Sequence, residues 1–240
     1  MKKTLLLLLI IPAISNAQFK DILAKAKEKI NTVTNSNSSL DIAAGLKEAL
    51  NKGVSEQVFK LTATDGFYKN EAVKIVMPEE LAKLDKTLRK MGMSKLADEG
   101  ILVLNRAAED AVKEATPIFV TAIKNITITD AKSILLGNDN AATVYLQSAT
   151  TTSLYAKFNP VVQQSIGKVG ADVIWANIIK QYNTMPFVAK VNPDLTDYVT
   201  QKALDGVFKM ITVEEKNIRT DINARTSNVL KKVFALQDKK

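Results

Sequence analysis

The stretch ALDGVFKMITVEEKNIR, residues 203–219, decides the fold class because its apolar side chains recur every three or four residues. On a helix that turns about 100° per residue, five of them fall on one side: Leu204, Val207, Phe208, Ile211 and Ile218. A stripe of this kind is typical of an amphipathic helix that packs one face against a core. The sequence therefore predicts a helix here.

Two carboxylates, Glu214 and Glu215, fall within about 60° of the middle of this stripe. We expect them at the margin of the core, where a carboxylate is costly unless a cation or several hydrogen-bond donors satisfy it. Arg219 follows Glu215 by four residues, which is the favourable order for an acid and a base on one helix. Arg225 comes shortly afterwards, in a loop or in the next helix.

A second polar group interrupts an apolar stripe in NRAAED, residues 105–110. Asn105 falls on the stripe itself, and Arg106 and Glu109 flank it. The two charged clusters could meet where their helices pack. Two interpretations stay open: a buried ion-pair lattice that fixes the register of the helices, which the pattern favours, and a polar pocket that receives an anionic or carbonyl group.

The neighbouring segments predict further helices. Apolar residues recur at helical spacing over residues 42–61, and the sequence ATDGFYKN, residues 63–70, interrupts the pattern. Residues 72–77 alternate apolar and other side chains, which indicates an extended strap or at most one arm of a hairpin. Residues 160–182 carry apolar side chains at helical spacing, and VIWANII, residues 173–179, is apolar on nearly every side, as in a central helix. The expected fold class is all-α, a compact multi-helix single domain.

Helix starts are marked by local chemistry. Pro78, followed by two acids, marks one start. Thr127 with Asp130 resembles a capping box in which aspartate replaces the usual glutamate or glutamine. Three dipeptides pair a capping side chain with a proline suited to the first helical position: Thr116-Pro117, Asn159-Pro160 and Asn192-Pro193. We expect a helix to begin at each of these sites.

The first residues predict export. Lys2 and Lys3 precede an apolar run, and small residues at positions 15 and 17 suit a signal peptidase, so residues 1–17 are expected to be a signal peptide. The run is about half as long as a membrane-spanning helix, so we expect no transmembrane span. The mature protein would be periplasmic, with extracellular secretion as an alternative. The remaining chain divides into an amphipathic arm with a polar linker, the all-helical domain and a basic tail: residues 18–39, 40–236 and 237–240.

The composition narrows the possible functions. Lys and Arg number 33 against 25 Asp and Glu in 240 residues, for a net charge of +8, but the lysines alternate with acids instead of forming one stripe. This pattern favours a solvated helix surface, and we expect no nucleic-acid partner. The chain has no histidine and no cysteine. It therefore has no Ser-His-Asp triad, cysteine nucleophile, histidine-ligated zinc or c-type haem attachment.

The remaining motifs do not identify an enzyme or a cofactor. The segment GNDNAAT, residues 137–143, lacks the closing glutamate of a calcium loop, and the glycines form no phosphate-binding pattern. Ser165 and Lys168 match the spacing of a serine–lysine pair, but the companion motifs of penicillin-binding enzymes are missing. Glu214 and Glu215 diverge by about 100° around a helix, so they are not a natural opposed pair for glycan hydrolysis. We expect no cofactor and no metal.

Several motifs resemble one family when taken in order: DGF at 65–67, NRAAE at 105–109, DAKSILLGNDNAAT at 130–143, YVTQKALDGVFKMITVEEKNIR at 198–219 and ART at 224–226. The chain is similar over roughly residues 40–234 to the exported bacterial proteins grouped as domain of unknown function 4197. The resemblance implies an exported, helical, single-domain protein of Gram-negative type bacteria. It implies no activity, substrate, cofactor or partner.

We therefore expect a non-catalytic helical binding or scaffolding protein of the cell envelope. It would hold an apolar small molecule whose polar end meets Arg106, Arg219 or Arg225, or it would engage another envelope protein through its surface or its N-terminal arm. The alternative is a hydrolase that acts on an envelope glycan or ester through Glu214 and Glu215. The candidate site residues are the polar members of the two clusters: Asn105, Arg106, Glu109, Glu214, Glu215, Arg219 and Arg225.

Overall fold

A computed structural model gives the fold of the chain from Ile42 onward, which forms one compact unit. It describes residues 42–90, 92, 94–168, 176, 179–180, 182–184, 190 and 194–238. All regular secondary structure in these ranges is helical, as the sequence predicts. The expected signal peptide, arm and linker lie outside the described residues, as do the last two residues of the expected tail.

In the first half of the unit, one helix is followed by a long connection and then by two further helices. A helix spans residues 42–62, and an irregular segment over residues 63–78 leads to α2 (Glu79–Lys90) and α3 (Ser94–Val112). The irregular segment, called the strap below, contains no strand, so the expected residues 72–77 within it are not an arm of a hairpin. Its alternate side chains Val73, Ile75 and Met77 are buried, while Val76 is exposed. The strap therefore covers part of the core without pairing to a sheet.

The second half contains the longest helices. The short helices α4 (Ala115–Lys124) and α5 (Ile128–Leu136) are followed by α6 (Ala141–Lys168). After a stretch that is described only in part, α8 (Thr196–Thr220) leads through the 3-10 helix η1 (Ile222–Ala224) to α9 (Asn228–Phe234). None of the described helices is long and apolar enough to span a membrane.

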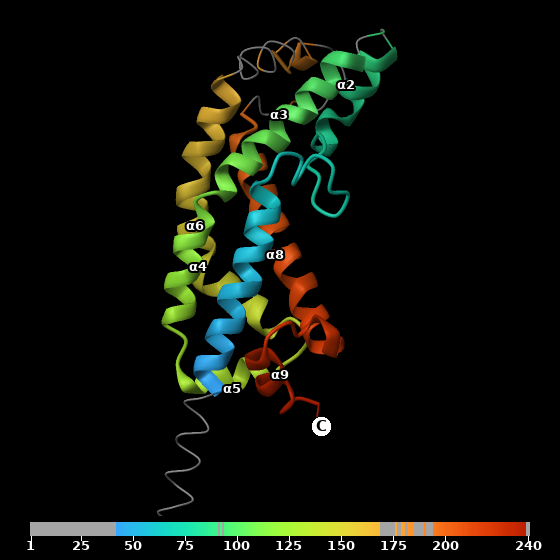
Figure 1. Ribbon diagram of the computed structural model, residues 1–240. Coiled ribbons are helices and arrows are strands. Elements are labelled where there is room, and N and C mark those ends of the chain that lie inside the picture. The colour runs from blue at the N-terminus through green and yellow to red at the C-terminus, as the bar shows by residue number, and fades with distance from the viewer. Residues whose placement is uncertain are drawn as a thin grey trace, which may run out of the picture. The chain divides into compact units, whose positions relative to one another are not determined.

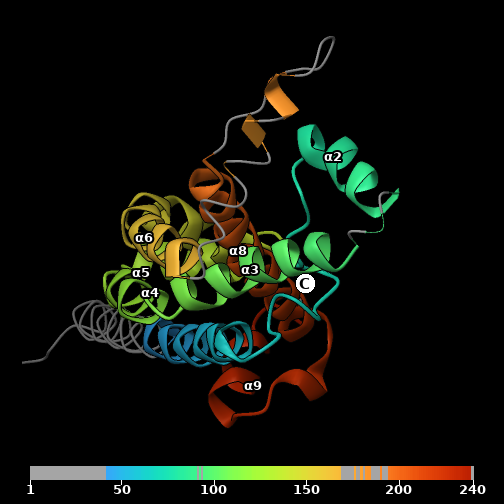
Figure 2. The same cartoon turned by 90° about the horizontal axis from the view of Figure 1, so that it is seen from above.

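Three helices, α3, α6 and α8, pack against one another at the centre of the unit, with α4 and α5 against α6 and α2 against α3 (Figure 1). The 42–62 helix lies beside α4, where Lys47 donates to the backbone oxygen of Lys124 at 2.8 Å. Figure 2 shows α4, α5 and α6 together on one side of α8 and α9 apart from them. The two ends of the described chain lie together, because Val229 and Val233 of α9 closely approach Gly45 of the 42–62 helix.

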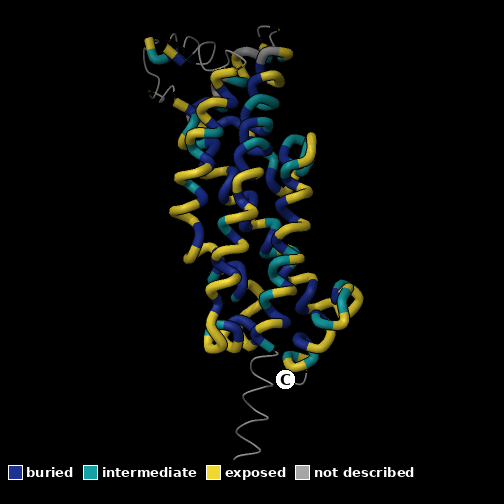
Figure 3. Tube along the Cα trace, turned by 60° about the vertical axis from the view of Figure 1, so that its left-hand side comes forward, coloured by how far each residue is buried: buried dark blue, intermediate teal, exposed yellow. Residues whose placement is uncertain are grey.

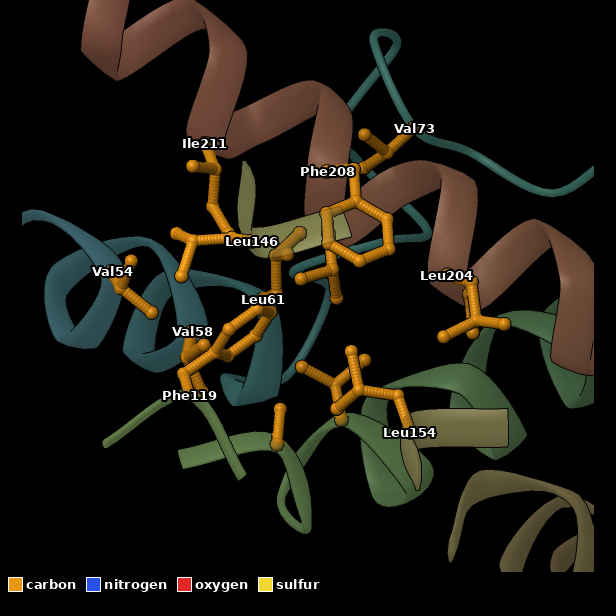
Figure 4. Close-up of a cluster of buried hydrophobic side chains, with 14 of the residues drawn as sticks. Val54, Val58, Leu61, Val73, Phe119, Leu146, Leu154, Leu204, Phe208 and Ile211 are labelled. Carbon is orange, nitrogen blue, oxygen red and sulfur yellow. The ribbon is translucent and has the colours of Figure 1, made fainter. Parts of the chain in front are cut away.

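The core runs along the helices as buried stripes with exposed outer faces (Figure 3). The predicted stripe of α8 is confirmed, because all five of its apolar members are buried. Phe208 of α8 meets Phe119 of α4 edge to face, with ring centroids 6.0 Å apart. Figure 4 shows Phe208 among side chains from the 42–62 helix, the strap, α4 and α6, including Val58, Val73 and Leu146. One shared core therefore joins segments that are far apart in the sequence.

Two predicted helix starts are confirmed and one is displaced. The helix α2 begins directly after Pro78, and Thr127 and Asp130 form the expected capping box at α5. Pro117 lies in the first turn of α4, but the helix begins at Ala115 and no side chain caps it. Proline is tolerated in a first turn because the backbone N–H groups there have no helical partner.

The start predicted at Asn159-Pro160 is wrong, because Pro160 lies inside α6. The side-chain amide of Asn159 does not cap a helix; it donates to the hydroxyls of Tyr155 and Thr200, at 3.4 Å each. Pro160 faces solvent, and buried residues continue on both sides of it, so tertiary packing carries the helix through the lost backbone bond. Asn192-Pro193 and most of the predicted helix after Lys168 lie outside the described residues.

Candidate functional site

Glu215 caps α6 from a distant helix. Its Oε1 accepts a hydrogen bond from the backbone N–H of Ala142 at 2.8 Å, and its Oε2 accepts from the N–H and the hydroxyl of Thr143, each also at 2.8 Å. The first N–H groups of a helix have no partner within the helix and carry its positive dipole end. A buried carboxylate from α8 therefore satisfies the start of α6.

Arg219 makes the matching contact with the end of α5. Its Nε and Nη2 donate to Oε1 of Glu215 at 3.0 and 2.8 Å. Nη2 also donates to the backbone oxygen of Ile134 at 2.7 Å, and Nη1 donates to that of Leu135 at 3.1 Å. The last carbonyl groups of a helix need such donors. One buried ion pair thus connects the end of α5 to the start of α6.

Arg225 holds the C-terminal turn against the end of α8. It is almost fully buried and donates to the backbone oxygens of Ile218 at 2.9 Å and Arg219 at 3.1 Å. Its guanidinium also pairs with both carboxylate oxygens of Asp238. This hydrogen bond raises the pKa of Arg225 and lowers the pKa of Asp238. The guanidinium carbon atoms of Arg219 and Arg225 lie 5.7 and 5.6 Å from the ring centroid of Phe234 on α9.

The cluster on α3 holds the strap. Asn105 donates from Nδ2 to the backbone oxygen of Ile75 and accepts at Oδ1 from its N–H, both at 2.8 Å. Oε1 of Glu109 accepts from the backbone N–H of Phe67 at 3.0 Å. Arg106 connects Oε2 of Glu109 to Asp65, with both distances 2.6 Å. These polar side chains therefore fix the path of the connection that follows the 42–62 helix.

The structure places the seven candidate residues in two clusters, one on α3 and one around the C-terminal end of α8, and the two clusters do not meet. Within the described part of the chain, no hydrogen bond or ion pair joins the α3 cluster to the α8 cluster. The strap reaches α8 where the Phe67 ring faces Gly206, and Glu214 lies eight residues further along that helix. Eight residues of helix span about 12 Å. The clusters, which could have met, are therefore separate among the described residues: five of the seven candidates are buried among partners of their own cluster, while Arg106 and Glu214 are partly exposed.

Glu214 differs from its neighbour, because it is half-buried and borders a small cavity. Its Oε2 accepts from Nε2 of Gln57 at 3.0 Å. The cavity has a free volume of about 30 Å³. Its walls come from the 42–62 helix, the start of α6, α8 and α9, and most of the residues that line it are apolar: Leu46, Ala49, Leu50, Gly53, Val54, Ala142, Ile211, Glu214, Glu215, Ile218, Arg219, Leu230 and Phe234.

The polar side chains of the two clusters are arranged for binding and for structural support of the helices. Both oxygens of Glu215 and of Glu109 are engaged by donors, so neither carboxylate is free to act on a substrate. Ser165 donates from Oγ to Asp110 at 3.0 Å. Partial burial raises the pKa of Asp110, but hydrogen bonds from Lys113 and Ser165 outweigh it and hold that pKa below its ordinary value. Among the described residues, no group of acidic side chains could hold a metal ion.

Several partners in the site were not predicted from the sequence. Thr143 and Gln57 contact the two glutamates but lie far from them in the sequence, and no local pattern connects them. Gln237 and Asp238 were included in a basic tail, yet they bind Arg219 and Arg225. Thr143 lies in the first turn of α6, at the end of the segment GNDNAAT, and nothing in this segment indicates the distant glutamate.

Comparison with known protein families matches most of the chain. The model of the family described as a protein of unknown function, DUF4197, matches residues 36–235. The chain belongs to the DUF4197 family. All seven candidate residues fall inside the matched region, whereas Gln237 and Asp238, which bind Arg219 and Arg225, lie beyond it. No curated protein and no solved structure is significantly similar to the chain.

Proposed function

We propose that this DUF4197 protein is an exported, non-catalytic binding protein of the cell envelope that holds a small apolar group in the cavity beside Glu214. The cavity carries the proposal. It lies between the 42–62 helix, α8 and α9, and its lining is apolar apart from three charged side chains. Small-molecule sites are typically concave and apolar, with few polar groups that fix orientation.

The size of the cavity limits its occupant. A volume of about 30 Å³ is room for two or three water-sized groups at roughly 10–15 Å³ each. Complete drug-sized ligands need about 300–1,000 Å³. The cavity therefore suits a very small molecule or the end of a chain, and not an enclosed lipid.

The charged groups next to the cavity support a binding role over a catalytic one. Glu215 and Arg219 neutralise each other and cap α5 and α6, so they serve the fold. Arg225, which was considered for the polar end of a ligand, is occupied by two backbone oxygens and Asp238. The hydrolase alternative needs two available carboxylates, and Glu214 alone has a hydrogen-bonding oxygen to spare.

Export is the second part of the proposal and rests on the sequence of residues 1–17. N-terminal sequencing of protein recovered from the periplasm of a Gram-negative host tests it directly. We expect the mature chain to begin at Gln18. Recovery of a chain that still begins with Met1 in the cytoplasmic fraction would show that the protein is not exported. It would leave the proposal of binding at the cavity unaffected.

Binding to the cavity is tested with xenon, because dry apolar cavities take up xenon and small hydrocarbons. Amide spectra of the protein, purified without detergent, would be recorded under increasing xenon pressure. We expect the backbone signals of Ala49, Leu50 and Ile218 to shift, while those of Ile75 and Asn105 in the other network stay in place. Small, uniform shifts at the cavity residues and around Ile75 and Asn105 would mean that xenon does not enter the cavity, and would contradict the proposed binding function.

A further inference from the structure

One wall of the cavity comes from α9, near the end of the chain. Leu230 and Phe234 of α9 line the cavity, and the other lining residues belong to the 42–62 helix, to the start of α6 and to α8. The buried carboxylate of Glu215 joins α8 to the first N–H groups of α6. The 42–62 helix is part of the shared core (Figure 4) and binds α8 through Gln57. Among these walls, the one formed by α9 therefore belongs to a terminal element.

α9 depends on its docking for stability. It has seven residues, Asn228–Phe234, whereas an isolated helix shorter than about 12–15 residues is only marginally stable in water. Its apolar side chains Leu230, Val233 and Phe234 are buried against the rest of the unit, and Lys231 faces solvent. A helix of this length that leaves its place has little to keep it helical, and the cavity then loses a wall.

Gly45 shapes the place where α9 rests on the 42–62 helix. A Cβ atom on Gly45 would lie 2.5 Å from Cγ2 of Val233 and 3.2 Å from Cγ1 of Val229. A larger residue would push α9 away, so this close approach requires glycine. The nearest atoms of α9 here are valine methyl groups. At this point α9 therefore rests on the helix by apolar packing.

Polar contacts join the segments before and after α9. Arg225 precedes the helix and Asp238 follows it, and both carboxylate oxygens of Asp238 accept from the guanidinium. The side chain of Asp238 is 39% exposed, so water can replace it. Arg225 would then keep its two backbone acceptors, the oxygens of Ile218 and Arg219. This contact can therefore open without leaving a buried guanidinium without acceptors.

We propose that α9 and the turn after it, residues 228–238, form a lid that opens to admit an apolar group to the cavity and closes over it; this inference rests on the proposed binding function. Local opening of folded proteins begins at the elements of lowest stability, which commonly include the terminal ones. When the lid opens, Leu230 and Phe234 leave the cavity. The remaining walls then form an apolar groove that is open to solvent.

A disulfide tests the lid by locking it. The Cβ position on Gly45 lies 4.0 Å from Cβ of Val233, within the roughly 3.5–4.5 Å of a disulfide. The chain has no cysteine of its own, so the double variant Gly45→Cys, Val233→Cys can form only one intramolecular disulfide. Replacing Val233 also removes the methyl group nearest to the new side chain. The reduced form of the same variant is the matched control.

Xenon entry is compared in the oxidised and reduced forms. Relaxation dispersion of the amide signals of Ala49, Leu50 and Ile218 under xenon pressure gives the rate of entry. We expect the reduced form to take up xenon at the rate of the natural protein. The oxidised form should take it up slower by about tenfold or more, because the cross-link disfavours the open states of the lid. Addition of a reductant should restore the rate.

A second variant loosens the lid and needs no cysteine. Asp238→Asn removes the charged partner of Arg225. We expect amide exchange of Lys231 and Ala235, whose N–H groups are hydrogen-bonded in α9, to accelerate about tenfold, and xenon to enter faster. Asp205→Asn, which removes an exposed acid from α8, should change neither rate. Should the cysteine variant fail to fold, these two variants decide the matter.

The outcomes separate the lid from the binding function. If the oxidised form takes up xenon as fast as the reduced form, the lid is wrong and the binding function stands. If the oxidised form is slow but Asp238→Asn behaves like Asp205→Asn, α9 is a lid that the contact with Arg225 does not hold. If xenon shifts no lining residue in the natural protein or in the reduced form, the binding function and the lid fail together.

Discussion

Glu215 and Arg219 face each other one helical turn apart on α8, with Oε1 of the acid 2.8 Å from Nη2 of the base and side-chain exposures of only 5% and 1%. The two side chains also bind opposite ends of neighbouring helices, the start of α6 and the end of α5. Their burial is therefore compensated by charge and by backbone groups at the same time. The pair fixes how the chain turns between α5 and α6.

Replacing Glu215 by glutamine should destabilise the protein strongly. The substitution removes the anion that neutralises buried Arg219, and breaking a buried pair in this way typically costs about 3–5 kcal/mol. Urea unfolding followed by circular dichroism measures the loss. The matched control is Glu214→Gln, which should cost under about 1 kcal/mol because Glu214 is half-buried and accepts one hydrogen bond from Gln57. Equal losses in both variants would show that the capping contacts of Glu215 contribute little.

Asn105 should prove essential for the strap. In Asn105→Leu, the backbone N–H and oxygen of Ile75 lose the partners that now lie at 2.8 Å, and each unsatisfied buried group costs about 1–3 kcal/mol. We expect amide exchange of Ile75 to accelerate and proteolysis to begin within residues 63–78. Asn105→Asp is the control, because it keeps the acceptor for the Ile75 N–H. It should leave that amide better protected than the leucine variant does.

The helical pattern was predictable because it depends on residues close in sequence. The phase of the α8 stripe placed Glu215 and Arg219 at the core, and their spacing predicted their pairing. Their partners on α5 and α6 were not predictable, because a stripe gives the direction of a side chain but not the element that it faces. The same limit explains why the sequence left open whether the two charged clusters meet, although they bind different segments.

Local signals failed where tertiary contacts compete with them. Asn159-Pro160 has the sequence of a helix start, but the Asn159 amide binds Thr200 of α8 and the helix continues. Thr127 and Asp130 followed the local rule because neither side chain is buried and their hydrogen bonds go only to each other and to their own backbone. The cavity had no sequence signal except a glycine inside a helix, at Gly53.

Two glycine-to-alanine substitutions should have opposite effects. Gly53→Ala should stabilise the protein by about 0.5–1 kcal/mol, because alanine favours the helix and its methyl group has space. Gly206→Ala should destabilise it by about 1–3 kcal/mol, because the new atom would lie 2.6 Å from the Phe67 ring and the core must shift. Thermal and urea unfolding of the two variants measure the difference. A destabilised Gly53→Ala variant would mean that the wall of the cavity is closer than the structure has it.

The contact between Arg225 and Asp238 should weaken in acid. The hydrogen bond from Arg225 lowers the pKa of Asp238 below its ordinary value of 3.8. An acid whose pKa is lower in the folded state stabilises the fold above its unfolded pKa and loses this contribution as the pH falls through its folded pKa.

Asp238→Asn should therefore be less stable than the natural protein at neutral pH, and the difference should shrink once the pH falls below 3.8. Urea unfolding over a series of pH values measures it. The control is Gln237→Ala, which removes from the same turn an uncharged acceptor that does not titrate, the side-chain oxygen that accepts from Arg219. Its effect should not depend on the titration of an acid, so a matching pH dependence in both variants would assign the acid sensitivity to another carboxylate.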